Sequence, residues 1–152
     1  MTSDQPIMTH SPIWPAEIRP DDEGRYLVTF PDLPEALTDG ATLGEAWDEA
    51  ADCLEEALAG RINRDEEIPV PGKIKRGQYK VFLDPQFMLK VLLYVHWRAA
   101  NITKTELAGR MQVRESEVRR LLDPHYGSKL PQMEKAFAAL GARITVSLEK
   151  VA

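Results

Sequence analysis

The strongest constraint on the fold is a change in the spacing of apolar residues early in the chain. Tyr26, Val28 and Phe30 alternate with other side chains, which predicts a strand with one apolar face. Over residues 43–58 the apolar side chains recur at intervals of three and four, which predicts an amphipathic helix. Strands followed by helices are typical of an α+β fold, and we expect that class here.

Local signals give limits for the first strands and for this helix. Two further extended segments are predicted at 13–18 and 35–38, each next to a turn signal. Thr42 and Glu45 form a T-x-x-E capping box at the start of the helix, and Gly60 is expected to end it.

The middle of the chain reads as a linker followed by a strand and a helix. Residues 61–77 combine charges, two prolines and two glycines without a sustained apolar period, which predicts a domain boundary. A brief strand is predicted at 79–83, and Asp84 followed by Pro85 is a helix start signal. The next stretch, FMLKVLLYVHWRAA, is apolar on nearly every face, so we expect it to pack within its domain and against a further surface, such as a second protomer.

The stretch TKTELAGRMQVRESEVRRLL, residues 103–122, is similar to a helix-turn-helix. Thr103 and Glu106 make a second capping box, and the apolar positions predict two short helices around a turn at Gln112. Ala108 stands where the two helices would approach most closely, and only a small side chain fits there. Glycine is common at the position of Gln112, because this turn often requires a positive φ.

The remainder of the chain is predicted to hold a loop, a helix and a terminal strand. The loop HYGSK follows Asp123 and Pro124, and residues 130–140 read as a supporting helix. In RITVSLE the apolar side chains at 144, 146 and 148 would share one face of a strand. A lone strand has unpaired edges, so we expect it to pair either with the strand at 79–83 or with its own copy in a second protomer.

Acidic and basic residues are segregated along the chain. Residues 1–72 hold 17 acidic residues, four arginines and no lysine, a net charge of −13. Residues 73–152 hold seven acidic and 15 basic residues, a net charge of +8. This asymmetry predicts two domains with different partners, since a basic surface attracts polyanions and an acidic one attracts cationic proteins. We expect a disordered lead-in at 1–12, an acidic domain at 13–60, a linker at 61–77 and a basic domain at 78–152.

A helix-turn-helix presents the first residues of its second helix to base edges in the major groove. Arginine can bind guanine, glutamate can accept from cytosine, and serine can reach a base or a phosphate. Arg114 also stands at the expected N-cap, where a short polar residue is usual, and a phosphate or base contact would explain it. The candidate DNA-binding residues are Thr103, Lys104, Arg114, Glu115, Ser116, Arg119, Arg120, His125 and Lys129. A solvated helix face with ordinary charges remains an alternative, since helix-turn-helix folds also serve as protein-binding modules.

Several other classes are disfavoured by the sequence. Three of the five carboxylates that could form a two-metal nuclease site, at 21–23, are consecutive in a turn and would point apart, so we expect no catalytic residue, metal or cofactor. The single cysteine, Cys53, has no partner for a disulfide, which suggests a reducing setting. No apolar run approaches the length of a membrane span and the start lacks a signal-peptide pattern, so we expect a cytoplasmic protein.

Two stretches together resemble the HicB family of antitoxins. The first is YLVTFPDLPEALTDGATLGEAWDEAADCLEEAL, close to that family's V-x-F-P-D-L-P-G-C-x-T-x-G-x-T-x-x-E-A pattern. The second is TELAGRMQVRESEVRRLLDPHYGSKL, which resembles the family's helix-turn-helix with its R-L-L-D-P ending. The sequence departs from the pattern at Glu35 and Ala36, where the family often has Gly and Cys, and at Gln112.

The resemblance implies a partial RNase H-like β-β-β-α-β domain without a nuclease site, followed by a DNA-binding domain. It implies that the acidic half inhibits a HicA-type toxin, a small basic ribonuclease that degrades mRNA, and that the basic half represses the operon of both proteins. A homodimer or higher oligomer is expected separately, because a dimer is the usual form for reading a two-fold operator. The candidate toxin-binding residues are Phe30, Asp32, Leu33, Glu35, Asp48 and Asp52. A stand-alone transcriptional regulator with an acidic sensor domain is the alternative, and a nuclease is a third.

Overall fold

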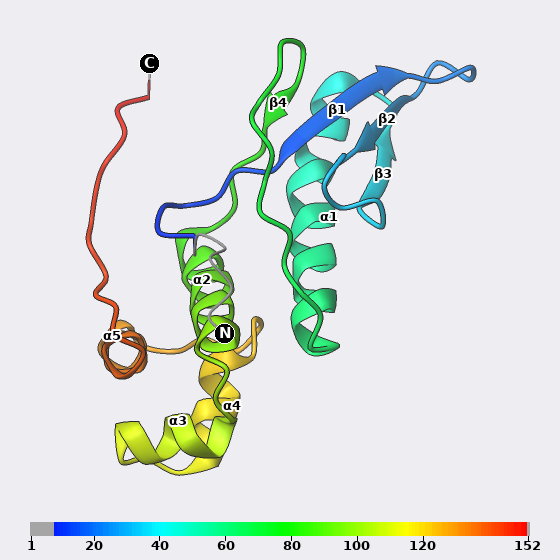
Figure 1. The fold of residues 1–152 in the computed structure, drawn as a ribbon. Coiled ribbons are helices and arrows are strands. Elements are labelled where there is room, and N and C mark those ends of the chain that lie inside the picture. The colour runs from blue at the N-terminus through cyan, green and yellow to red at the C-terminus, as the bar shows by residue number, and fades with distance from the viewer. Residues whose placement is uncertain (1–7, 152) are drawn as a thin grey trace.

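The computed structural model describes residues 8–151, and four antiparallel strands form its single sheet (Figure 1). They are β1 (Pro15–Pro20), β2 (Tyr26–Thr29), β3 (Leu37–Gly40) and β4 (Tyr79–Lys80), in the order β3-β2-β1-β4. In β1 and β2, Ile18 pairs with Val28, and in β2 and β3, Val28 pairs with Thr38. The α+β class and the β-β-β-α-β element order are therefore confirmed.

Helix α1 (Leu43–Asn63) covers one face of this sheet. The predicted capping box forms, because Thr42 Oγ1 accepts a hydrogen bond from Glu45 N at 3.1 Å. The expected end at Gly60 is wrong: the helix runs on to Asn63. Continuation allows Ile62 to be buried in the core, and that burial outweighs the weak helix propensity of one glycine.

The loop between β2 and β3 is anchored by three buried side chains at spacings of three. Phe30, Leu33 and Ala36 are each at most 1% exposed. Two successive turns place them on one side, since Leu33 N donates to Phe30 O and Ala36 N donates to Leu33 O. The loop therefore closes the end of the core between the sheet and α1.

Helix α2 (Pro85–Ala100) takes part in both hydrophobic cores. Asp84 caps it as predicted, accepting from the backbone N–H groups of Gln86 and Phe87. One side of α2, including Val91 and Tyr94, packs into the core beneath the sheet, while Leu93 packs into a second core among the later helices. The expectation of burial on two sides is confirmed, although both partners come from the same chain.

The second core is formed by α2 with α3 (Lys104–Met111), α4 (Glu115–Leu122) and α5 (Leu130–Ala139). The predicted pair of short helices with an intervening turn is present as α3 and α4, at the end of the molecule away from the sheet (Figure 1). Gln112 adopts the left-handed conformation, with φ 57°, that glycine often supplies there. Ala108 and Val118 are buried between the helices, as expected.

The chain after α5 forms no strand within one molecule. Residues 142–151 run as an extended segment that pairs with no strand, and the proposed mate at 79–83 contains β4, which is the edge strand of the sheet and pairs only with β1. Pairing of the tail with the strand at 79–83 is therefore wrong. The other candidate, a second protomer, stays a prediction.

The predicted linker and lead-in both contact the first core. Ile68 is buried, and Trp14 Nε1 donates to Pro69 O at 3.0 Å. Residues 1–7 of the expected disordered lead-in lie outside the described residues, but Met8 packs against the first core and its carbonyl lies 3.0 Å from His96 Nε2. The functional division into two domains stays a prediction. Among the described residues, no helix has the length and apolar character needed to cross a membrane.

Candidate functional site

The basic end of the molecule exposes most of the residues predicted to bind DNA. On α4 and at its start, Arg114, Ser116, Arg119 and Arg120 are exposed, because Val118, Leu121 and Leu122 turn the other side of the helix into the core. Arg114 is the N-cap and makes no capping hydrogen bond through its side chain. The first turn of α4 thus has no side-chain cap, and Glu117 N donates instead to Arg114 O at 3.0 Å.

The arginines of α4 have partners that orient them without burying them. Arg119 Nη2 lies 2.8 Å from Glu115 Oε1, one turn earlier, and its side chain remains 68% exposed. The Arg120 guanidinium lies 5.8 Å from the centre of the Tyr126 ring, within the range of a cation–π contact. Both cations remain available to a ligand.

The loop after α4 adds further polar groups to the same surface. Arg120, Tyr126 and Lys129 line one hollow, so the structure brings two of the predicted residues together there. His125 is exposed beside it, held by a bond from its backbone N–H to Asp123 Oδ1 at 3.0 Å.

The other two predicted residues lie at the start of α3. Thr103 Oγ1 accepts a capping hydrogen bond from Glu106 N at 3.0 Å, and Lys104 Nζ lies 5.7 Å from the Trp97 ring centre. Among the hydrogen bonds, ion pairs and cation–π contacts of the described residues, none joins the side chain of Thr103 or Lys104 to the α4 group.

Lys90 on α2 holds this surface together, and sequence reasoning missed it. Its side chain is 1% exposed, and its ammonium group donates to Arg120 O at 2.9 Å, Leu121 O at 2.8 Å and Ser128 Oγ at 2.6 Å. The charge lies at the carboxyl end of α4, where the helix dipole favours a cation. Burial lowers the pKa of Lys90 to about 8. The available signal was one lysine inside the apolar run FMLKVLLYV.

At the acidic end, the structure buries two of the six residues predicted to contact the toxin. Phe30 is 1% exposed and Leu33 is completely buried, so neither side chain offers a surface to a partner protein. Alternation placed Phe30 correctly on the core face of its strand, and the turn that follows carries Leu33 inward as well. Their role in this structure is to anchor the loop.

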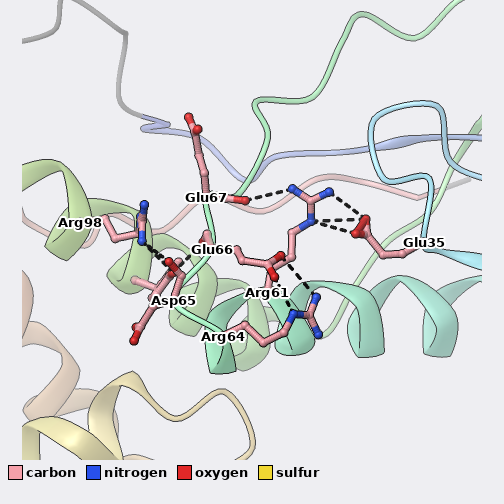
Figure 2. Close-up of polar contacts among 8 residues, drawn as sticks. Glu35, Arg61, Arg64, Asp65, Glu66, Glu67 and Arg98 are labelled. Atoms are coloured by element: carbon pink, nitrogen blue, oxygen red, sulfur yellow. Dashed lines mark hydrogen bonds and ion pairs between the residues drawn. The ribbon is translucent and has the colours of Figure 1, made fainter.

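Glu35 lies at the surface of that loop and has a partner (Figure 2), and so does Asp32. Arg61 of α1 binds both carboxylate oxygens of Glu35, at 2.9 to 3.3 Å, and also donates to Glu67 O at 3.1 Å. Asp32 Oδ2 accepts from Gly72 N at 3.0 Å. These contacts tie the loop to the end of α1 and to residues 67–72, so the charge of Glu35 is already compensated.

The outer face of α1 carries acidic side chains without such compensation. Asp48 and Asp52, both predicted contacts, are exposed on it. We define the acidic stripe as Glu45, Asp48, Glu49, Asp52 and Glu56, which are all exposed and recur at helical spacing. None of the ion pairs within residues 8–151 involves a member of this stripe.

The carboxylates considered for a metal site do not converge. Within residues 8–151 no three His, Cys, Asp or Glu side chains form a group suited to a metal ion. Asp21 accepts from Glu23 N and Arg25 N, and Asp39 pairs with Arg25 at 2.8 Å. The described carboxylates therefore serve turn and surface contacts.

Comparison with known proteins identifies the family of this chain. Residues 13–92 match the sequence model of a family described as HicB_like antitoxin of bacterial toxin-antitoxin system. Antitoxin HicB 1 of Photorhabdus laumondii is 38% identical over 136 residues, covering 90% of this chain and 86% of the relative. Antitoxin HicB of Escherichia coli K12 is 33% identical over 133 residues, covering 88% and 96%.

A further relative, Antitoxin HicB of Pseudomonas fluorescens, is 32% identical over 130 residues, which are 85% of this chain and 89% of that protein. These matches define the class of protein as an antitoxin of a bacterial toxin–antitoxin system. The chain belongs to the HicB family of antitoxins.

Proposed function

We propose that this antitoxin binds and inhibits a small basic mRNA-cleaving toxin of the HicA type and represses its own operon through α3 and α4, acting as a helix-turn-helix. It does so in the cytoplasm, without enzymatic activity, as a homodimer or higher oligomer. The observation that carries the proposal is the separation of charge. The uncompensated acidic stripe lies on α1, which covers the sheet, and the exposed arginines lie on α4, which packs in the second core.

The direct test is co-expression with the adjacent open reading frame. The antitoxin should restore growth to cells that produce a small basic protein from that frame, and the two proteins should elute together. Growth arrest that the antitoxin does not relieve would contradict the proposal. Relief without a shared elution peak would contradict inhibition by direct binding.

The toxin-binding surface that we propose centres on the acidic stripe. A ribonuclease needs a cationic surface to hold RNA, and a stripe of carboxylates can occupy that surface by complementary charge. Asp48 and Asp52 lie one turn apart at the middle of the stripe and carry no internal partner among the described residues. Their charge is free to act on the partner.

Reversing two of these charges should weaken inhibition of the toxin. The variant Asp48→Lys with Asp52→Lys is expected to raise the Kd for the toxin by about a hundredfold or more, because like charges would meet across the interface. Binding can be measured by calorimetry at two salt concentrations.

The matched control for this reversal is Asp22→Lys with Glu23→Lys, which alters two exposed acidic residues of the β1–β2 turn and leaves the net charge the same. The control should bind the toxin nearly as tightly as the parent chain. Equal losses in the two variants would show that only overall charge matters and that the stripe is not the contact surface.

For DNA, the geometry favours α4 as the helix that enters the major groove. Its exposed side carries Arg114, Ser116, Arg119 and Arg120, and Lys90 fixes its end to α2. His125 and Lys129 of the following loop are exposed, and in this proposal they contact the phosphate backbone, which sets register and affinity.

Removing the two exposed arginines should reduce the salt dependence of DNA binding. For Arg119→Ala with Arg120→Ala, the slope of log K against log salt should fall by about 0.9 for each phosphate that the protein no longer neutralises, up to about 1.8. Titrations of operator DNA over a range of salt concentrations measure this. Arg19→Ala with Lys80→Ala, two exposed cations on the sheet, is the control, and its slope should match the parent. A slope unchanged by removal of Arg119 and Arg120 would exclude them from the backbone contacts.

A further inference from the structure

The extended tail of this chain has the properties of a strand that lacks a partner. Val146 is 85% exposed and Leu148 is 97% exposed, although both are strongly apolar. Ile144, on the same face at period two, is half-buried against the second core. Figure 1 shows the tail leaving α5 and running clear of the sheet. A row of exposed apolar side chains with free backbone groups on both edges favours pairing with another chain.

We infer that residues 143–149 pair antiparallel with the same residues of a second copy, with the twofold axis at Val146. This inference rests on the dimer of the proposed function and specifies how that dimer is built. The axis places Val146 opposite itself and Ile144 opposite Leu148 on one face. On the other face, Arg143 lies opposite Glu149 and Thr145 lies opposite Ser147.

Charge and side-chain alternation select this register over its neighbours. A shift by one residue would place the apolar side chains of the two copies on opposite faces of the ribbon. A two-residue shift keeps the faces but removes the Arg143–Glu149 pair, which occurs twice in the symmetric ribbon. That shift also sets Leu148 opposite Ala142, or Ile144 opposite Lys150, depending on its direction. The central register alone pairs all three apolar residues with one another.

Pairing in this register also buries exposed apolar side chains of the tail against the second core of the other copy. In the single chain Ile144 packs at the edge of the second core. Leu148 of the other copy lies directly opposite this residue in the ribbon, so each tail carries its most exposed apolar side chain onto the helical core of its partner. The exchange buries two Leu148 side chains and extends both cores.

The first test is the oligomeric state of the full chain alone. Size-exclusion chromatography with light scattering should give a multiple of the monomer mass that contains the tail-paired dimer. Val146→Asp sets two carboxylates against each other on the axis and should shift this species to half its mass. Val70→Asp, another exposed valine changed in the same way, should leave the mass unchanged. An unchanged mass for Val146→Asp, or a monomeric parent chain, would overturn the inference.

The second test addresses the register. Arg143→Glu places two like-charged pairs across the ribbon and should weaken dimerisation by about tenfold, while adding Glu149→Arg restores the opposite charges and the affinity. Failure of the second change to restore the dimer would reject this register.

Cysteines on the axis provide an independent measurement. In a Cys53→Ala chain, Val146→Cys should form an intermolecular disulfide under mild oxidation, because residues directly opposite one another have close β-carbons. Leu148→Cys is the control: its own copy would lie roughly 14 Å away in this register, beyond the reach of a disulfide. Equal crosslinking at both positions would indicate parallel pairing and overturn the inference.

These measurements need neither toxin nor DNA. A dimer that fails to inhibit the toxin or to bind the operator would contradict the proposed function and leave the tail pairing intact. Toxin inhibition by a chain that stays monomeric would overturn the tail pairing and the proposed oligomer, and would leave the proposed inhibition of the toxin intact.

Discussion

Replacing Gly40 with alanine is expected to lower the melting temperature by roughly 6–12 °C, for a loss of about 3 kcal/mol. Gly40 is the last residue of β3 and faces the first turn of α1, where the two backbones are in close contact. A β-carbon there would lie 2.8 Å from Ala46 Cα and 2.9 Å from the Glu45 carbonyl carbon, and closer still to Ala46 N. All three are backbone atoms, so relief requires that α1 move away from the sheet.

Gly44→Ala is the matched control for this substitution. Gly44 lies in the first turn of α1, and a β-carbon there meets only Thr42 Oγ1, at 3.9 Å. Alanine should be neutral or slightly stabilising at this position, by up to about 1 kcal/mol. Thermal unfolding followed by circular dichroism compares the two variants with the parent. Equal melting temperatures for Gly40→Ala and Gly44→Ala would show that β3 and α1 are not held at this distance in solution.

The second large effect is expected at Lys90. Lys90→Met keeps the length of the side chain but removes the three N–H donors that bind Arg120 O, Leu121 O and Ser128 Oγ. These acceptors would then be buried without a partner, which lowers the free energy of unfolding. The thioether of methionine is easier to bury than an ammonium group, so we expect a net loss of about 2 kcal/mol. Operator affinity should also fall, since the end of α4 and the following loop lose their common anchor.

The same residue gives stability a defined dependence on pH. Burial lowers the pKa of Lys90 to about 8 in the folded chain, against an ordinary value of 10.5. Between these two values the unfolded chain binds more protons at this position than the folded chain. The contribution of Lys90 to the free energy of unfolding therefore rises with pH from about 8 to about 10.5, and is flat below that window.

Urea denaturation at pH 7, 8 and 9.5 measures both effects. The difference in unfolding free energy between parent and Lys90→Met should grow as the pH rises through this window. Lys135→Met, which changes an exposed lysine of α5, is the control and should show neither the loss of stability nor the growing difference. A constant difference across the three pH values would mean that Lys90 does not titrate in this range.

Much of the fold was predictable because its signals are local. The caps at Thr42, Asp84 and Thr103 were identified from residue type and spacing, and each forms the expected hydrogen bonds. Gln112 takes the left-handed conformation that its place in the turn requires. Arg114 stands at the N-cap of α4 without a capping bond, as anticipated from its lack of a short acceptor. Such features depend on a few neighbouring residues, and the sequence displays those directly.

The errors arose where distant contacts decide the outcome. Gly60 does not end α1, because burial of Ile62 favours another turn of helix. The short strand at Tyr79 joins the sheet beside β1, and the tail pairs with no strand of its own chain. No pattern of neighbours along the sequence specifies these pairings.

Of the candidate surface residues, the exposed arginines of α4 and the aspartates of α1 were identifiable from helical periodicity alone. Lys90 was not, because its three acceptors come from residues 30 to 38 positions further along the chain. A charged side chain within an apolar helix shows that a partner must exist, but the partner becomes apparent only once the chain is folded.

The placement of α2 has a consequence for any attempt to divide this antitoxin. A fragment that ends before α2 would expose the floor of its sheet-and-helix core, and a fragment that begins with α2 would expose Phe87, Val91 and Tyr94 to water. A cut between residues 64 and 84 would therefore leave an apolar core surface exposed on each fragment. The two cores are therefore expected to fold and to be degraded together, because a protease that removes α2 from one core also removes it from the other.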